Sequence, residues 1–285
     1  MGIKDSSVFV YPVDNYGTTR EIRELIKIEK PDALFLITDP RYFLHIWNME
    51  QEIRKSIPIT YLNIWDDYPA PMFNQPYYEA CDLLMGISKQ TVNINKLVLK
   101  GREGNRIFKY IPHGKDPNIY FPIEDNDLEF INFKKSIFKD KKPKFVLYFN
   151  SRNIRRKQIP DALMAFRAFL DSLPEEEAKD CYMILKTEKV TSAGTDLVKV
   201  KEYLFDENYS SNVMFIDQKL SEQQLNWLYN LADVQILLTS NEGWGLANTE
   251  AMLAGTPIIA NVTGGMQDQM RFVDENGEWF TPSAD

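Results

Sequence analysis

Cysteine and histidine are scarce in this chain. Its 285 residues include only two of each, and the cysteines, Cys81 and Cys181, lie far apart in the sequence. This scarcity argues against a disulfide framework and against a zinc site of the Cys/His kind. We expect both thiols to be inert core residues of a protein in a reducing compartment, the cytoplasm.

Long apolar runs and a surplus of basic residues are missing as well. No run approaches the ~20 apolar residues that span a bilayer, and the start, Met1-Gly-Ile-Lys-Asp, turns polar too early for a secretory signal. The sequence therefore predicts no transmembrane segment and leaves peripheral contact with a membrane open. The net charge of −8 disfavours nucleic acid as a partner. No G-x-G-x-x-G follows a candidate strand, which disfavours a dinucleotide-dependent oxidoreductase.

Short apolar runs alternate with amphipathic stretches along the whole chain. This pattern is typical of parallel sheets flanked by helices, so we expect an α/β fold with two doubly wound domains that bind ligands beyond the carboxyl ends of their strands. The strands expected in the first half are Val8–Tyr11, Ala33–Thr38, Ile59–Asn63, Leu83–Gly86 and Ile107–Tyr110. Those expected in the second half are Phe145–Phe149, Tyr182–Lys186, Val213–Ile216, Val234–Leu238 and Ile258–Ala260.

The charged segment from Asn118 to Pro143 is the expected junction between the domains. It contains Pro122, an acidic patch and then a run of lysines, a composition typical of a solvated linker. We therefore expect an N-terminal domain over residues 1–140, which includes the linker, and a C-terminal domain over residues 141–285.

The most informative string is Glu242-Gly-Trp-Gly-Leu-Ala-Asn-Thr-Glu250, which follows the candidate strand Val234–Leu238. We expect a helix over Asn248 to Ala254, ended by Gly255. A helix that starts at such a turn directs backbone N–H groups at whatever lies above the strand end, which suits phosphate. Ionised carboxylates only accept hydrogen bonds, which suits hydroxyl groups. The string therefore predicts a site for a ligand that carries both.

A second string, Asn150-Ser-Arg-Asn-Ile-Arg-Arg-Lys157, follows the candidate strand Phe145–Phe149 and precedes a helix. At the carboxyl end of a strand, Arg152 and Lys157 would supply positive charge for a diphosphate. Taken alone, the string is better explained as a solvated basic loop. Its occurrence together with the glutamate string favours the functional interpretation, with Arg155 and Arg156 as additional or outward-facing charges.

The glutamate string resembles the signature of the retaining glycosyltransferases of family 4 (glycosyl transferases group 1), two glutamates separated by seven residues. The flanking Ser240-Asn241 and Glu250-Ala-Met-Leu-Ala-Gly-Thr-Pro fit the same signature. The resemblance implies the GT-B fold, in which two Rossmann-like domains face a cleft. Family members usually begin with further βαβ units and end with a helix that returns to the first domain. We therefore expect a first domain that is incomplete, and either a minimal variant of the family or, as we favour, a part of a longer protein.

The resemblance also implies roles for individual residues. Glu242 would contact hydroxyl groups of the donor sugar, and Arg152 and Lys157 would contact its diphosphate. These three residues form the expected catalytic set. Glu250 would bind the ribose of the donor nucleotide.

Further residues are assigned by position. Gly243, Gly245 and Leu246 would line the donor site at the start of the helix, because glycine allows a ligand to approach the backbone closely. Asp66 and Asp67 would lie on the acceptor side, although an aspartate pair in a proline-containing turn explains them equally well. The string Ile111-Pro-His-Gly-Lys-Asp116 resembles the family's Pro-Asn/His-Gly-x-Asp, where we expect a structural turn near the hinge.

The predicted activity is transfer of a sugar from a nucleoside-diphosphate sugar to an unknown acceptor, with retention of configuration. No metal or other cofactor would be required, because Arg152, Lys157 and the helix N-terminus would supply the countercharge that a metal provides elsewhere. The alternative is a nucleotide-sugar binding module, or a fragment, without transfer activity.

Overall fold

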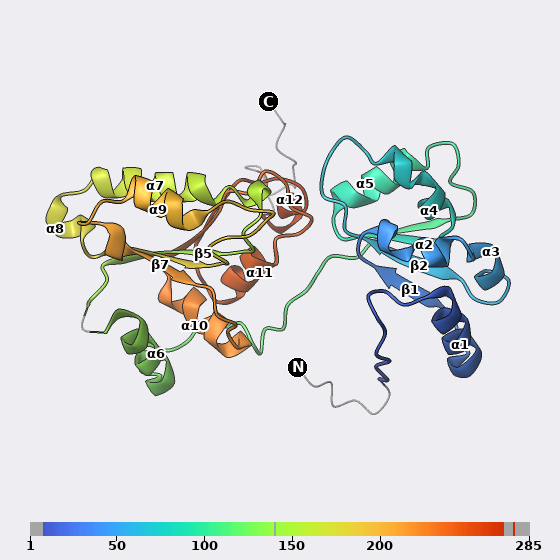
Figure 1. Cartoon of the computed structure of the whole chain (residues 1–285), viewed down its shortest axis with the longest axis horizontal. Coiled ribbons are helices and arrows are strands. Elements are labelled where there is room, and N and C mark those ends of the chain that lie inside the picture. The colour runs from blue at the N-terminus through green and yellow to red at the C-terminus, as the bar shows by residue number, and fades with distance from the viewer. Residues whose placement is uncertain (1–7, 140, 271–275, 277–285) are drawn as a thin grey trace. The chain divides into compact units, whose positions relative to one another are not determined.

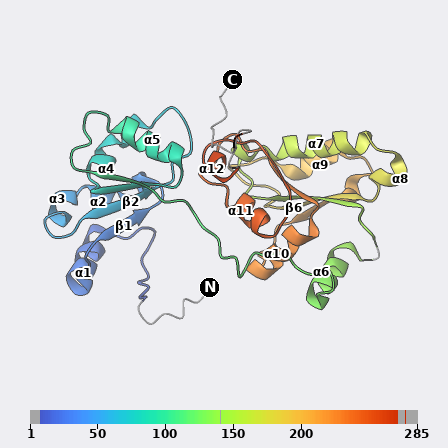
Figure 2. The same cartoon turned by 180° about the vertical axis from the view of Figure 1, so that it is seen from behind.

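The protein is a two-unit α/β structure. The computed structural model describes residues 8–139, 141–270 and 276, and the chain divides into compact units over residues 1–112 and 113–285. Each unit has its own parallel sheet and its own hydrophobic core (Figures 1 and 2). The predicted α/β class with Rossmann-like domains is confirmed.

Unit 1 contains a four-stranded parallel sheet in the order β1-β2-β3-β4. Its strands are β1 (Leu34–Ile37), β2 (Ile59–Asn63), β3 (Leu83–Gly86) and β4 (Ile107–Tyr110), each within one residue of its prediction. Its helices are α1 (Thr19–Glu29), α2 (Leu44–Trp47), α3 (Glu50–Ile53), α4 (Gln75–Glu79) and α5 (Lys89–Val98), with 3-10 turns at Pro40–Phe43 and Met72–Asn74.

The predicted strand Val8–Tyr11 is wrong. The segment has no regular secondary structure, and all four side chains are exposed. A strand requires a partner for its backbone hydrogen bonds as well as an apolar composition. Among the described strands, the edge strand β1 pairs with β2 alone, so residues 8–11 do not join the sheet.

Unit 2 contains a five-stranded parallel sheet in the order β7-β6-β5-β8-β9. The strands are β5 (Phe145–Asn150), β6 (Cys181–Lys186), β7 (Val213–Ile216), β8 (Val234–Leu237) and β9 (Ile258–Ala260). The helices are α6 (Leu128–Phe138), α7 (Ile159–Asp171), α8 (Glu175–Ala178), α9 (Leu197–Leu204), α10 (Glu222–Leu231), α11 (Leu246–Leu253) and α12 (Met266–Met270), with 3-10 turns at Arg155–Lys157 and Ser210–Asn212.

Alternation along β5 builds a core on each face of this sheet. Leu147 and Phe149 pack under α7 and α9, whereas Val146 and Tyr148 pack against α6, α10 and α11. Figure 1 shows α7 and α9 over one face and α10 on the other. Strands buried on both faces read as continuous apolar runs, which is why their positions were predictable.

Both cysteines are buried, as predicted. Burial raises the pKa of the Cys81 thiol and of the Cys181 thiol. Because the thiolate is the reactive form, burial lowers the reactivity of both thiols.

None of the helices in the described parts of the chain is long and apolar enough to cross a bilayer. The longest helix of the described residues, α7, has 13 residues, against the ~20 that a span needs.

The segment that follows residue 112 belongs to unit 2, although the sequence assigned it to the first domain as a linker. The Asp127 carboxylate caps α6 by accepting a hydrogen bond from the Phe130 N–H at 2.8 Å. Phe130 and Phe138 are buried in the core of unit 2. Together with Phe133 and Ile137 they follow the i, i+3, i+7, i+8 pattern of an amphipathic helix, which the lysines between them obscure. The division therefore falls at 112/113 instead of near 140.

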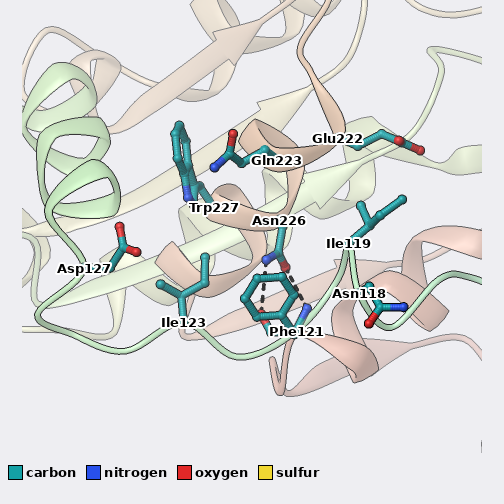
Figure 3. A pocket seen from close by; sticks show the side chains of 9 residues that line it. All are labelled: Asn118, Ile119, Phe121, Ile123, Asp127, Glu222, Gln223, Asn226 and Trp227. Carbon is teal, nitrogen blue, oxygen red and sulfur yellow. Dashed lines mark hydrogen bonds between the residues drawn. The ribbon is translucent and has the colours of Figure 1, made fainter. Parts of the chain in front are cut away.

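Two asparagines of α10 hold the extended part of this segment. The Asn226 side chain accepts from the Phe121 N–H at 3.2 Å and donates to the Phe121 carbonyl at 3.1 Å (Figure 3). The Asn230 side chain accepts from the Ile123 N–H at 2.7 Å. A cavity of about 400 Å³ lies beside these contacts, and it is lined by Asn118, Ile119, Phe121, Ile123, Asp127, Glu222, Gln223, Asn226 and Trp227.

Replacing Asn226 by Ala should lower the free energy of unfolding of unit 2 by about 1–2 kcal/mol, because the Phe121 N–H loses its acceptor and the Phe121 carbonyl keeps only the hydrogen bond from Asn230. Urea unfolding measures this loss, and hydrogen exchange should show weaker protection of the Phe121 amide. Asn208→Ala is the matched control, since Asn208 is exposed and it is its backbone N–H that donates to the Asp206 carboxylate. Unchanged protection of the Phe121 amide in Asn226→Ala would contradict the assignment of this segment to unit 2.

Candidate functional site

The site of unit 2 is positioned by the pairing of β5 with β8. The two strands are parallel neighbours, with Leu147 opposite Val234, and the chain leaves them towards opposite edges of the sheet. Such a reversal of strand order opens a crevice outside the carboxyl ends of the strands. The loops that leave these ends, residues 151–158 and 238–245, are the two strings that the sequence singled out.

Hydrogen bonds hold the two loops together. The Ser240 N–H donates to the Arg156 carbonyl at 2.8 Å. The Thr239 hydroxyl donates to the Asn241 carbonyl at 2.8 Å and lies 3.2 Å from the Arg156 carbonyl. Residues far apart in the sequence are thereby fixed side by side.

The Glu242 carboxylate is the meeting point of the loops. The Lys157 ammonium donates to its Oε2 atom, and the Arg156 guanidinium donates to the same oxygen at 3.2 Å. Arg156 also donates to the Asn241 carbonyl. The side chains of Glu242 and Lys157 are only 13% and 9% exposed, so water screens this ion pair less than it screens a surface pair.

The structure places the arginines of the basic string differently from the expectation. Arg156, expected to be additional or outward-facing, contacts Glu242. The Arg152 side chain, in contrast, is 82% exposed and lies 3.9 Å from the Glu188 carboxylate. Arg155 is exposed, as expected. Sequence spacing alone could not separate these arginines, because the 3-10 turn over Arg155–Lys157 decides which of them points at Glu242.

A buried asparagine that the sequence analysis did not select anchors the basic loop. The Asn153 side chain accepts from the Thr195 N–H at 3.0 Å and donates to the Thr195 carbonyl at 2.7 Å. A Cβ atom on Gly194 would lie 2.1 Å from the Asn153 Oδ1 atom, so this contact requires glycine. The signal available in the sequence was weak, since an isolated asparagine in a loop is common.

The helix expected from Asn248 begins two residues earlier, at Leu246, directly after the glycine-rich turn. Gly245 is the N-cap, with φ of +85°, and a Cβ atom there would lie 3.0 Å from the Met266 side chain. Within the described residues, the N–H groups of Leu246 and Ala247 have no hydrogen-bond partner. Gly243 is buried between Glu242 and this helix start. The arrangement offers backbone donors to an anion.

The loop after β9 contacts the backbone of Glu242. The Gly265 N–H donates to the Glu242 carbonyl at 2.9 Å, and a Cβ atom on Gly264 would lie 2.1 Å from that oxygen. Only glycine allows this approach.

The second glutamate, Glu250, is buried in α11 and has different partners from those of Glu242. Its Oε2 atom accepts from the Tyr229 hydroxyl at 2.6 Å, and its Oε1 atom lies 2.6 Å from the Lys115 ammonium. The Asn150 side chain donates to the Tyr229 oxygen at 2.8 Å. Burial raises the pKa of Tyr229 well above its usual value, so the phenol stays protonated and donates to the carboxylate.

Asp66 and Asp67 belong to unit 1, whereas the predicted donor residues belong to unit 2. The Asp67 carboxylate accepts from the Tyr68 N–H at 2.8 Å, and its carbonyl accepts from the Trp65 indole at 2.7 Å. Asp67 therefore takes part in a turn, and Asp66 is half-buried beside it.

His113, in the string before Lys115, is half-buried at the first position of unit 2. Burial lowers its pKa below the usual value. Across the described residues, no three His, Cys, Asp or Glu side chains gather as a metal site would require.

Comparisons with known proteins bear on this site. The family model described as glycosyl transferases group 1 matches residues 129–285, which is more than half of the chain. A curated relative, mannosylfructose-phosphate synthase of Agrobacterium fabrum (strain C58 / ATCC 33970), is 23% identical over 190 residues. That match covers 66% of this chain and 39% of the relative.

Solved structures show the same fold. The α,α-trehalose 6-phosphate synthase of Burkholderia multivorans matches with a TM-score of 0.66 and 12% identity, over 88% of this chain and 61% of that one. The sucrose-phosphate synthase of Thermosynechococcus elongatus matches with a TM-score of 0.64 and 14% identity, over 88% and 61%. A structure described as trehalose-6-phosphate from E. coli bound with UDP-2-fluoro glucose matches with a TM-score of 0.63 and 14% identity, over 88% and 64%.

At these identities the structural matches establish the fold, which is GT-B, and the chain spans less than two thirds of each of these proteins. The family is established by the family model, which matches most of unit 2. The matched residues include the charged side chains of both strings, from Arg152 to Glu250. The chain belongs to the glycosyl transferases group 1 family.

Proposed function

We propose that the chain transfers a sugar from a nucleoside-diphosphate sugar to an acceptor, with retention of configuration and without a metal. The observation that carries this proposal is the partly buried Glu242–Lys157–Arg156 cluster beside the start of α11, at the carboxyl ends of β5 and β8. It combines cations and backbone donors for a diphosphate with a carboxylate for sugar hydroxyls.

The chemical problem of the reaction is the negative charge that develops on the departing diphosphate. Lys157 and the N-terminus of α11 are held in place before the donor arrives, so little reorganisation is needed when the charge appears. Arg152 is exposed and pairs with Glu188 only at 3.9 Å. The Arg152 side chain can therefore move to the diphosphate without breaking a strong contact. Its position is compatible with the predicted role of binding the diphosphate.

The surroundings of Glu242 bear on the route by which configuration would be retained. A carboxylate that accepts hydrogen bonds from Lys157 and Arg156 is a weak nucleophile, and a retaining double displacement needs a carboxylate free to attack. We therefore favour attack by the acceptor on the same face as the departing diphosphate, with the donor phosphate assisting. Glu242 then binds donor hydroxyls and does not form a bond to the sugar.

The names of the similar proteins suggest the first substrates to test. One similar structure is described with UDP-2-fluoro glucose, so uridine diphosphate sugars are the first donors. Relatives named as synthases of mannosylfructose phosphate and sucrose phosphate make sugar phosphates the first acceptors. Donors carrying guanine and adenine complete the panel.

Replacing Lys157 by Met should lower kcat/KM for transfer by on the order of a hundredfold, because one preorganised cation on the diphosphate is lost. Binding of UDP, GDP and ADP by calorimetry should weaken in parallel. Lys157→Arg keeps the charge and should retain part of the activity. Arg155→Ala removes an exposed arginine of the same turn and should change neither quantity. Normal transfer by a folded Lys157→Met protein would rule out the assigned role.

Chelation with EDTA should leave the transfer rate unchanged within about twofold, because the countercharge comes from the protein. The measurement compares EDTA-treated enzyme with enzyme in Mg²⁺. A loss of activity that Mg²⁺ restores would refute metal independence. Donor binding without turnover for any acceptor would support the alternative, a nucleotide-sugar binding module.

A further inference from the structure

The carboxylate expected to bind the donor ribose is already occupied by a lysine. The Glu250 side chain is 8% exposed, and each of its oxygens has a donor at 2.6 Å, Lys115 on one and Tyr229 on the other. A ribose diol needs the same oxygen atoms as acceptors. Tyr229 is fully buried and held by Asn150, whereas the Lys115 side chain retains 23% exposure. Of the two donors, Lys115 is the one that can move.

Lys115 is held in this position by a second contact. Its ammonium lies 5.3 Å from the centroid of the Tyr120 ring, and Tyr120 packs edge-on against Tyr229 at 6.1 Å. Both Lys115 and Tyr120 belong to the first residues of unit 2, directly after the boundary at 112/113. The ion pair therefore joins this segment to α11.

Lysine suits an exchange of partners. Its ammonium is a point charge on a flexible four-carbon stem, so it can leave one anion for another without a fixed fork geometry. An ammonium that leaves a buried carboxylate needs a new counter-ion, because a charge without a partner is costly away from water. A nucleoside diphosphate carries both the diol that would displace Lys115 and the anion that would take it over.

We propose that Lys115 is a donor-site residue that changes partners: it neutralises Glu250 in the empty protein and pairs with the donor diphosphate when the ribose displaces it. This inference rests on the proposed function. In this scheme the diphosphate is necessary for ribose binding. A nucleoside alone would displace Lys115 from Glu250 but would bring no new counter-ion for the ammonium group. The protein would thereby discriminate against nucleosides and in favour of nucleoside diphosphates.

The test compares uridine, guanosine and adenosine with UDP, GDP and ADP, by calorimetry and by competition, on wild type and Lys115→Met. In Lys115→Met the nucleoside should bind more tightly than in wild type. The preference for the diphosphate over the nucleoside should fall by about tenfold, a typical size for coupling between two parts of a ligand. Lys115→Arg keeps the charge and should retain the preference. Lys179→Met, which removes a lysine from an exposed ion pair with Glu176, is the matched control and should behave as wild type.

Each outcome decides one question. An unchanged preference in a folded Lys115→Met protein, or weaker binding of the nucleoside, would overturn the inference and make Lys115 a fixed support of Glu250. Because the ratio of two affinities is measured on the same protein sample, a general loss of stability does not mimic the expected result. If wild type binds none of the three diphosphates, the proposed function fails instead.

Discussion

The parallel pairing of β5 with β8 is the constraint on which the rest of unit 2 depends. These strands are neighbours in space, but about 85 residues separate Lys157 from Glu242 along the chain. Once they pair, their carboxyl ends release two loops into the same crevice. The hydrogen bond from the Ser240 N–H to the Arg156 carbonyl then fixes the loops to each other. The charge cluster is a consequence of sheet topology.

The two glutamates of one string have different surroundings because they lie on different structural elements. Glu242 belongs to the loop before Gly245 and contacts cations of the basic loop. Glu250 lies inside α11, where it faces the core between Tyr229 and Lys115. Both side chains are largely shielded from water, but Glu242 is paired with cations of a loop, whereas Glu250 is paired with a buried tyrosine and with Lys115. This difference is the reason why a partner of Glu250 becomes relevant to donor binding.

Glycine and asparagine position the charged side chains without taking part in charge interactions themselves. Gly245 adopts a left-handed conformation that starts α11, and Gly264 allows a close approach to the Glu242 carbonyl. Asn153 ties the basic loop to Thr195. Each of these residues controls where a backbone can go, so a substitution at any of them would move the site without touching its chemistry.

The sequence by itself determined the strands, the parallel class and the two strings, because buried parallel strands are continuous apolar runs and because helix starts have local signals. It did not determine that residues 8–11 lack a strand partner, that α6 packs on unit 2, or that Arg156 and not Arg152 contacts Glu242. Nor did it show that Lys115 pairs with Glu250. These outcomes depend on contacts between residues distant in the chain. Only the tertiary structure decided them, because the partner of a backbone or of a charge is set by where the sheet brings it.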